Sequence, residues 1–165
     1  MSDIKNNPRF KNKLIKAVRG TLEHRAAWLY LLVDEAEKCG LQSDKFAKAA
    51  IMRCGCFQGD ALREKTGSKS LKGLKRSLFT LSARLVFEMK IKECTDDRLY
   101  IDFYHCPLVA AWQAQGVSDK KIAELCDIAM EGDRGVAKSF GCELELGETI
   151  SKGADRCEIG FKRIG

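Results

Sequence analysis

The period of the hydrophobic pattern changes along this chain of 165 residues, and that change restricts the folds that it can adopt. Up to about residue 83, apolar residues recur every three or four positions, as they do in amphipathic helices. Apolar and polar residues then alternate in two neighbouring segments, "VFEMKIKEC" (86–94) and "RLYIDFYH" (98–105). The intervening "TDD" is typical of a turn, so the two segments predict a β-hairpin.

Three helices are predicted before the hairpin. The first covers 10–39 and ends at Gly40, which suits a C-terminal cap. The second covers "SDKFAKAAIMRC" (43–54), and Ser70 begins the third. We expect a loop at "FQGDALREKTGS" (57–68), because this stretch is polar and contains two glycines.

Two further helices and two further strands are predicted after the hairpin. Pro107 suits the first turn of a short helix that Gly116 ends, and Ser118 caps the next helix. The segments "CELELGETI" (142–150) and "DRCEIGFKRI" (155–164) alternate again. This order predicts an α+β fold, in which an antiparallel sheet of about four strands packs against helices.

Length and composition suit a single domain over 1–165, with an N-terminal helical part (1–66) and an α+β part (67–165). The longest apolar run, 26–33, is too short to span a membrane, and the N-terminus has no apolar signal region. We therefore expect a cytoplasmic protein without a membrane partner.

The net charge of +6 comes without a recognisable nucleic-acid-binding module, so no nucleic acid partner is predicted. The basic residues suit a solvated surface or a pocket for a small anion. The sequence leaves open whether the protein forms a homo-oligomer.

Eight cysteines are spread along the chain. Without an export signal, such thiols are more often buried, metal-binding or reactive than paired in disulfides. Only Cys54 and Cys56 are close together, as C-G-C at the expected end of a helix. That pair fits a redox-active dithiol or an irregular helix end. Free cysteine also serves as a small apolar core residue.

The residues between the hairpin and the next helix have specialised chemistry. The positive end of the helix dipole would lower the pKa of the Cys106 thiol. His105 beside it suits a base, an acid or a ligand. Because adjacent residues of a strand point to opposite faces, the two share a site only if the strand has already ended. Asp127 and Asp133 are the carboxylates of the following helix, where acidic residues are usually solvated.

Three segments in this half of the chain resemble a known family. They are "HCPLVAAWQ" (105–113), "ELCDIAMEGDRG" (124–135) and "ETISKGADRCEIGF" (148–161). Together they resemble the L-2-amino-thiazoline-4-carboxylic acid hydrolase family and, more distantly, the 4-vinyl reductase domain, a small α+β ligand-binding fold. The resemblance covers roughly 70–161. It implies hydrolytic opening of a cyclic isothiourea, the thiazoline ring of a cysteine derivative, at a non-peptide C–N bond.

That chemistry requires proton transfer and a grip on the substrate carboxylate. The positions that match the family pattern are Cys106, Cys126, Asp127, Gly153 and Cys157. The candidate catalytic residues are Cys106, His105 and Asp127. The candidate groups for the substrate carboxylate are Arg134 and Arg156. The candidate ligands of a divalent metal such as zinc are Cys106, Cys126 and Cys157.

A different class of function stays open at this point. A small-molecule-binding domain without catalysis, or a sensing domain based on thiols or a metal, would use the same cysteines as core or ligand residues. In both classes the expected partner is a small-molecule carboxylate, as substrate or as ligand.

Overall fold

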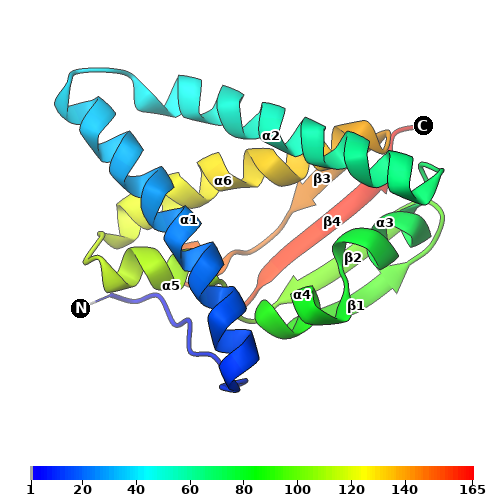
Figure 1. The fold of residues 1–165 in the computed structure, drawn as a ribbon, viewed down its shortest axis with the longest axis horizontal. Coiled ribbons are helices and arrows are strands. Elements are labelled where there is room, and N and C mark those ends of the chain that lie inside the picture. The colour runs from blue at the N-terminus through cyan, green and yellow to red at the C-terminus, as the bar shows by residue number, and fades with distance from the viewer. Residues whose placement is uncertain (1) are drawn as a thin grey trace.

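The structure is a computed structural model that describes residues 2–165. Within these residues the chain forms helices and strands in an α+β order (Figure 1). The helices are α1 (Lys13–Lys38), α2 (Ser43–Thr66), α3 (Leu71–Leu78), α4 (Leu81–Val86), α5 (Pro107–Ala114), α6 (Asp119–Ser139) and the short 3-10 helix η1 (Ile150–Lys152). The strands are β1 (Met89–Cys94), β2 (Arg98–Phe103), β3 (Cys142–Leu146) and β4 (Cys157–Arg163).

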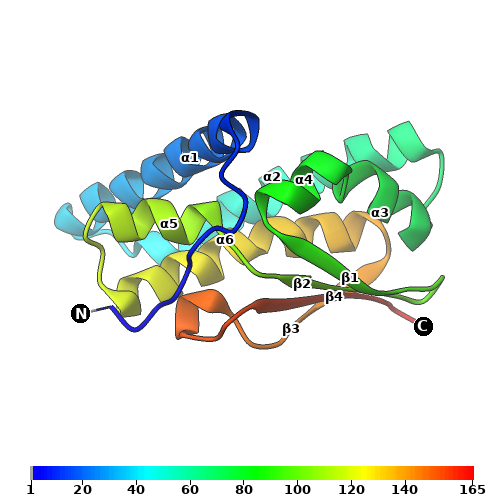
Figure 2. The same cartoon turned by 90° about the horizontal axis from the view of Figure 1, so that it is seen from below.

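The four strands form one antiparallel sheet in the order β1-β2-β4-β3. Figure 2 shows the sheet as one layer beneath the helices, with its other face open. The predicted α+β class, with a four-stranded antiparallel sheet packed against helices, is therefore confirmed. In the central pair of strands, Leu99 lies opposite Phe161 and Phe103 lies opposite Cys157.

The hydrophobic core lies between the inner face of the sheet and the helices. Its largest side chains, Trp112, Phe140 and Phe161, are completely buried. Trp112 lies on α5, and its indole N–H donates a hydrogen bond of 2.9 Å to the Ala26 carbonyl of α1. The buried indole is therefore satisfied, as a buried N–H group has to be.

The first strand begins later than the alternating pattern predicted. Val86 is the last residue of α4, and β1 begins at Met89. Thr80 separates α3 from α4, and its side-chain oxygen accepts a hydrogen bond from the Ala83 N–H. Between helix and strand, Glu88 has a φ of +53°, which is uncommon for a residue with a side chain.

A buried ion pair holds this turn. Arg19 of α1 approaches the Glu88 carboxylate at 3.0 Å, and both side chains are almost fully buried. Arg19 also donates to the carbonyls of Phe10, Leu85 and Val86 at 2.6, 3.3 and 2.8 Å. Glu88 accepts the backbone N–H groups of Arg9 and Phe10. The pair therefore joins the N-terminal segment, α1, the end of α4 and the start of β1.

The loop predicted at 57–68 is wrong. Helix α2 continues through this stretch to Thr66 and ends at Gly67, whose φ is +65°. The C-G-C pair consequently lies inside the helix and not at its end. Gly55 and Gly59 are buried against α6, so the glycines that suggested a loop allow two helices to approach closely.

The predictions for α5 and α6 are confirmed. Helix α5 begins at Pro107, and Gly116 follows its end with a φ of +71°. Ser118 caps α6 by accepting the backbone N–H of Lys121. None of the helices within 2–165 is long and apolar enough to cross a membrane.

Candidate functional site

Three cysteines from three different elements meet inside the molecule. Cys106 precedes the first turn of α5, Cys126 lies on α6, and Cys157 is the first residue of β4. Cys126 and Cys157 are close enough to Cys106 to raise the pKa of its thiol, and Cys126 acts in the same way on Cys157. We call these three residues the thiol cluster.

Short polar groups border the thiol cluster on the side of η1. The backbone N–H of Ile150 donates to the Cys157 sulfur at 3.3 Å. The Ser151 hydroxyl lies beside Cys126 and stabilises its ionised form, and it also shares a 3.1 Å hydrogen bond with Thr149. Thr149 and Ser151 are both buried. Cys157 is buried, whereas Cys106 and Cys126 are only partly buried.

The expectation of a low pKa at Cys106 is wrong. The N–H groups of Leu108 and Val109 lie near the sulfur and lower its pKa, although neither forms a capping hydrogen bond. Burial outweighs them and raises the pKa of this thiol far above its ordinary value, because a thiolate loses its hydration there. Burial also raises the pKa of Cys126, and it raises the pKa of Cys157 to about 12. All three thiols are therefore protonated at neutral pH.

His105 does not share a site with the thiol cluster. It is 1% exposed, and its neighbours are Arg19, Glu88 and Asn6. Neither ring nitrogen completes a hydrogen bond, although a backbone group of Asn6 lies nearby. Burial, and then the charge of Arg19, lower the pKa of His105 to about 4, while Glu88 opposes this shift. The ring is therefore neutral at pH 7.

The low pKa of His105 predicts an acid-sensitive fold. As the pH falls from about 6.5 to about 4, the unfolded chain takes up a proton at this ring before the folded chain does, so unfolding becomes more favourable. Between pH 7 and pH 4.5 we expect the wild type to lose roughly 2 kcal/mol more unfolding free energy than His105→Leu. Urea unfolding of both proteins at the two pH values measures the difference. Equal losses in the two proteins would contradict the buried neutral ring.

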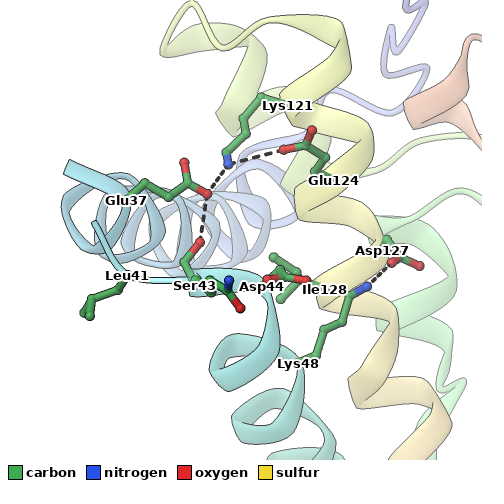
Figure 3. Close-up of a pocket in the computed structure, with 10 residues that line it drawn as sticks. Glu37, Leu41, Ser43, Asp44, Lys48, Lys121, Glu124, Asp127 and Ile128 are labelled. Atoms are coloured by element: carbon green, nitrogen blue, oxygen red, sulfur yellow. Dashed lines mark hydrogen bonds and ion pairs between the residues drawn. The ribbon is translucent and has the colours of Figure 1, made fainter. Parts of the chain in front are cut away.

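Asp127 lines an open pocket (Figure 3), although its charge also raises the pKa of the neighbouring Cys126 thiol. The pocket has a volume of about 390 Å³ and lies between the start of α2 and the outer side of α6. Asp127 pairs with Lys48 at 2.6 Å, and across the pocket Lys121 bridges Glu37 and Glu124. The hydrogen bond from Lys48 holds the pKa of Asp127 below its ordinary value. Asp127 is thus an exposed carboxylate paired with an ammonium group.

The two predicted arginines lie apart from each other. Arg134 is on α6, where its guanidinium is 2.8 Å from Glu131 and 3.9 Å from Asp127. Arg156 precedes β4 and pairs with Glu158 and Asp102, whose side chains lie on the open face of the sheet. The predicted grouping of both arginines with Cys106, His105 and Asp127 is therefore not assembled in this structure.

Asp133, which the sequence did not favour over Asp127, is the unusual carboxyl group of α6. Although part of its side chain reaches the surface, the surrounding protein raises its pKa to about 6, against the charges of Arg25 and Arg134. Its own charge raises the pKa of Cys126, an effect that the charge of Asp127 exerts more strongly. Asp133 follows Cys126 by seven residues, or two helical turns, so both lie on one side of α6. That spacing is the sequence signal that connects it to the thiol cluster.

The metal prediction gains no support. Within residues 2–165, no group of three or more His, Cys, Asp or Glu side chains is arranged to hold a metal ion. Cys106, Cys126 and Cys157 approach one another, but as protonated thiols they form a weakly polar cluster and not a preformed set of thiolate ligands.

Six chains of known structure match this architecture. One of them is the crystal structure of a trafficking protein particle complex subunit 3 from Naegleria fowleri covalently bound to palmitic acid. The likeness has a TM-score of 0.57 at 16% sequence identity, and it covers 85% of this chain and 93% of that one. At this identity it shows the fold alone. No curated protein matches the sequence.

A family profile matches the sequence itself. It describes L-2-amino-thiazoline-4-carboxylic acid hydrolase and covers residues 19–161, which is most of the chain. The match includes the thiol cluster and Asp133, and it extends the resemblance from residue 70 back into α1. The chain belongs to the L-2-amino-thiazoline-4-carboxylic acid hydrolase family.

Proposed function

We propose that this protein hydrolyses the ring of a substrate like 2-aminothiazoline-4-carboxylate at a non-peptide C–N bond. Family membership supports the substrate class. The structural observation that carries the proposal is the position of Asp133, a carboxyl with a pKa of about 6, on the same side of α6 as Cys126 of the thiol cluster. A group with a pKa near the working pH is suited to move protons.

In the proposed reaction, Asp133 acts as general base on a water molecule. The water oxygen adds to the amidine carbon, between the ring sulfur and the ring nitrogen. The bond from this carbon to the ring nitrogen then breaks, and the nitrogen receives both protons of the water. One water is consumed, and the product is an S-carbamoyl compound, a thiocarbamate, with a free amine. No oxidant or reductant is needed.

The thiol cluster suits binding better than nucleophilic attack. Because all three thiols are protonated, they present polarisable, uncharged sulfur to the ring. Arg134 is the proposed partner of the substrate carboxylate, since its charge already acts on Asp133 from the same helix. Binding the substrate there requires the guanidinium to leave Glu131, whose side chain is 18% exposed.

Asp133→Asn should abolish most of the activity. Loss of a general base typically lowers kcat by roughly 10²–10⁴-fold. In the wild type, activity should rise as the pH passes about 6, and this limb should be missing in the variant. Ring opening is followed by mass spectrometry as the gain of one water. The variant should be at least as stable as the wild type at pH 7, because ionising a carboxyl whose folded-state pKa is raised favours unfolding.

Asp127→Asn is the matched control, because Asp127 lies on the same helix and faces the open pocket. It should retain wild-type activity.

Cys106→Ala should raise KM more than it lowers kcat, if this thiol binds and does not attack. If Asp133→Asn opens the ring as fast as the wild type, Asp133 is not the base. If the wild type opens no ring at any pH from 5 to 9, the hydrolase proposal fails for this substrate.

The second candidate is a small-molecule-binding domain without catalysis. The observation that favours it is the protonated state of every thiol in the cluster, which leaves no ready nucleophile or metal ligand. The Naegleria protein of similar fold is described as carrying a covalently bound palmitic acid. Calorimetric binding of aminothiazoline carboxylate without turnover, weakened by Cys106→Ala, would favour this function over hydrolysis.

A further inference from the structure

Helix α1 has an apolar side that no other residue within 2–165 covers. Leu14, Trp28 and Leu32 are 74%, 61% and 66% exposed, and Val18 is also exposed. With Thr21 and Arg25 they recur at alternating spacings of four and three, which places them along one side of the helix. We call Leu14, Val18, Thr21, Arg25, Trp28 and Leu32 the α1 stripe.

The stripe is separate from the side of α1 that joins the core. That side carries Ile15, Ala26 and Val33, which are buried, and α1 packs on α5 (Figure 2). Single exposed apolar residues are common on proteins, but four of them along one side of a helix, with only Thr21 and Arg25 between them, mark a surface that binds a partner.

We infer that the α1 stripe binds the α1 stripe of a second copy of this chain, in an antiparallel pair about a twofold axis. The positions are symmetric about residue 23: 14 with 32, 18 with 28, and 21 with 25. A twofold axis at that point would place Leu14 against the partner copy's residue 32 and Val18 against its residue 28. Such a self-complementary patch is what a twofold interface requires.

The shape and charge of α1 favour the same arrangement. The tryptophan of one copy would enter the space around Ala17 and Thr21 of the other, where side chains are small and exposed. Lys11 precedes helix α1 and Lys13 is its first residue, while Glu35, which pairs with Lys38 at 2.7 Å, follows the stripe. An antiparallel pair would bring the basic end of each copy to the acidic end of the other, whereas a parallel pair would oppose like charges.

The available surface suits a modest dimer. The stripe spans nineteen residues from 14 to 32, and the eighteen steps between its ends correspond to about 27 Å of helix. Exposed Phe10 and Leu41 lie beyond its two ends and extend the apolar surface. Standard interfaces bury roughly 800 Å² on each partner. The area that the α1 stripe would bury together with Phe10 and Leu41 is of this order. This inference does not depend on the proposed reaction.

Light scattering coupled to size-exclusion chromatography tests the proposal. At roughly 100 µM, well above the Kd of a micromolar dimer, the wild type should have twice the chain mass of 18.4 kDa. Leu32→Glu should raise the Kd at least about 100-fold, because the substitution acts twice in a twofold interface and buries two charges. Leu81→Glu is the control: Leu81 is equally exposed, at 70%, but lies on α4.

A charge exchange tests the orientation. Lys11→Glu should weaken the dimer several-fold, and adding Glu35→Lys should restore it, because the two positions are opposite each other only in the antiparallel pair. A monomeric wild type at this concentration would overturn the proposal. So would equal dissociation by Leu81→Glu. Failure of the second charge change to restore the Lys11→Glu dimer would overturn the antiparallel arrangement.

Discussion

Replacing Gly55 with alanine is expected to destabilise the fold by about 3 kcal/mol, at the upper end of overpacking effects. A Cβ atom at this position would lie 2.0 Å from the Gly132 carbonyl oxygen and 2.7 Å from its carbonyl carbon. Both are backbone atoms, so no side-chain rotation relieves the contact. Helix α2 would have to move away from α6, and this pair of helices makes the most extensive contact between elements of the fold.

Urea unfolding followed by circular dichroism measures this loss, and two other glycines serve as controls. Gly132→Ala should be tolerated, because its Cβ would meet only the Ile51 methyl group at 3.6 Å. Gly20→Ala, in open space inside α1, should stabilise by up to about 1 kcal/mol through helix propensity. If Gly55→Ala unfolds at the wild-type urea concentration, the close approach of the two helices is wrong.

Replacing Arg19 with methionine is expected to cost about 3–5 kcal/mol, which is typical when one partner of a buried ion pair is removed. The Glu88 carboxylate would remain buried without its counter-charge. The carbonyls of Phe10, Leu85 and Val86 would also lose their donor. The turn between α4 and β1 would then lack the contact that holds its unusual backbone conformation.

A double-mutant cycle isolates the ion pair from the rest of this network. Glu88→Gln keeps the acceptor oxygen but removes the charge, so it should destabilise less than Arg19→Met. The double variant should be more stable than the sum of the single losses predicts, because each single variant leaves one buried charge unpaired. Additive losses in urea unfolding would mean that the two side chains do not interact. Lys38→Met, on an exposed pair of the same helix, is the control and should change stability by less than about 1 kcal/mol.

The sequence predicted the sheet better than the junctions between elements. Apolar and polar residues alternate in β2 and β4 because one face of the sheet packs on the core and the other stays open. The residue pattern alone therefore predicts these strands. The start of β1 was placed three residues early because Phe87 extends the alternation of Met89 and Ile91 by chance. The position of Val86 is instead set by Arg19, a residue 67 positions away. Contacts at such separations leave no local signal.

Glycine was misread for a similar reason. Gly59 lies in a polar stretch, and composition alone favours a loop there. In the structure its Cβ position would be 2.7 Å from the Ser139 side chain, so the residue is small because another helix lies against it. Only knowledge of the partner helix distinguishes the two explanations.

The catalytic, substrate-binding and metal-binding roles of the candidate residues stay predictions. The thiols of Cys106, Cys126 and Cys157 gather because each was placed on an inward side of its element. Asp127 differs from Cys126 by one residue, or about 100° around a helix, which turns it toward the open pocket. The protonated state of the thiols was missed because the sequence shows the helix dipole but not the depth of burial that opposes it.

The position of β4 has a consequence for how the chain folds as it is synthesised. This strand lies between β2 and β3, yet it is made after every other strand. Until it emerges, the β1-β2 hairpin has an open edge, and β3 has no neighbour to pair with. Newly made chains therefore expose strand edges that invite pairing with other chains. Slowing translation between residues 146 and 157 should lengthen that exposure and increase aggregation, while the helices on either side of the hairpin have already formed.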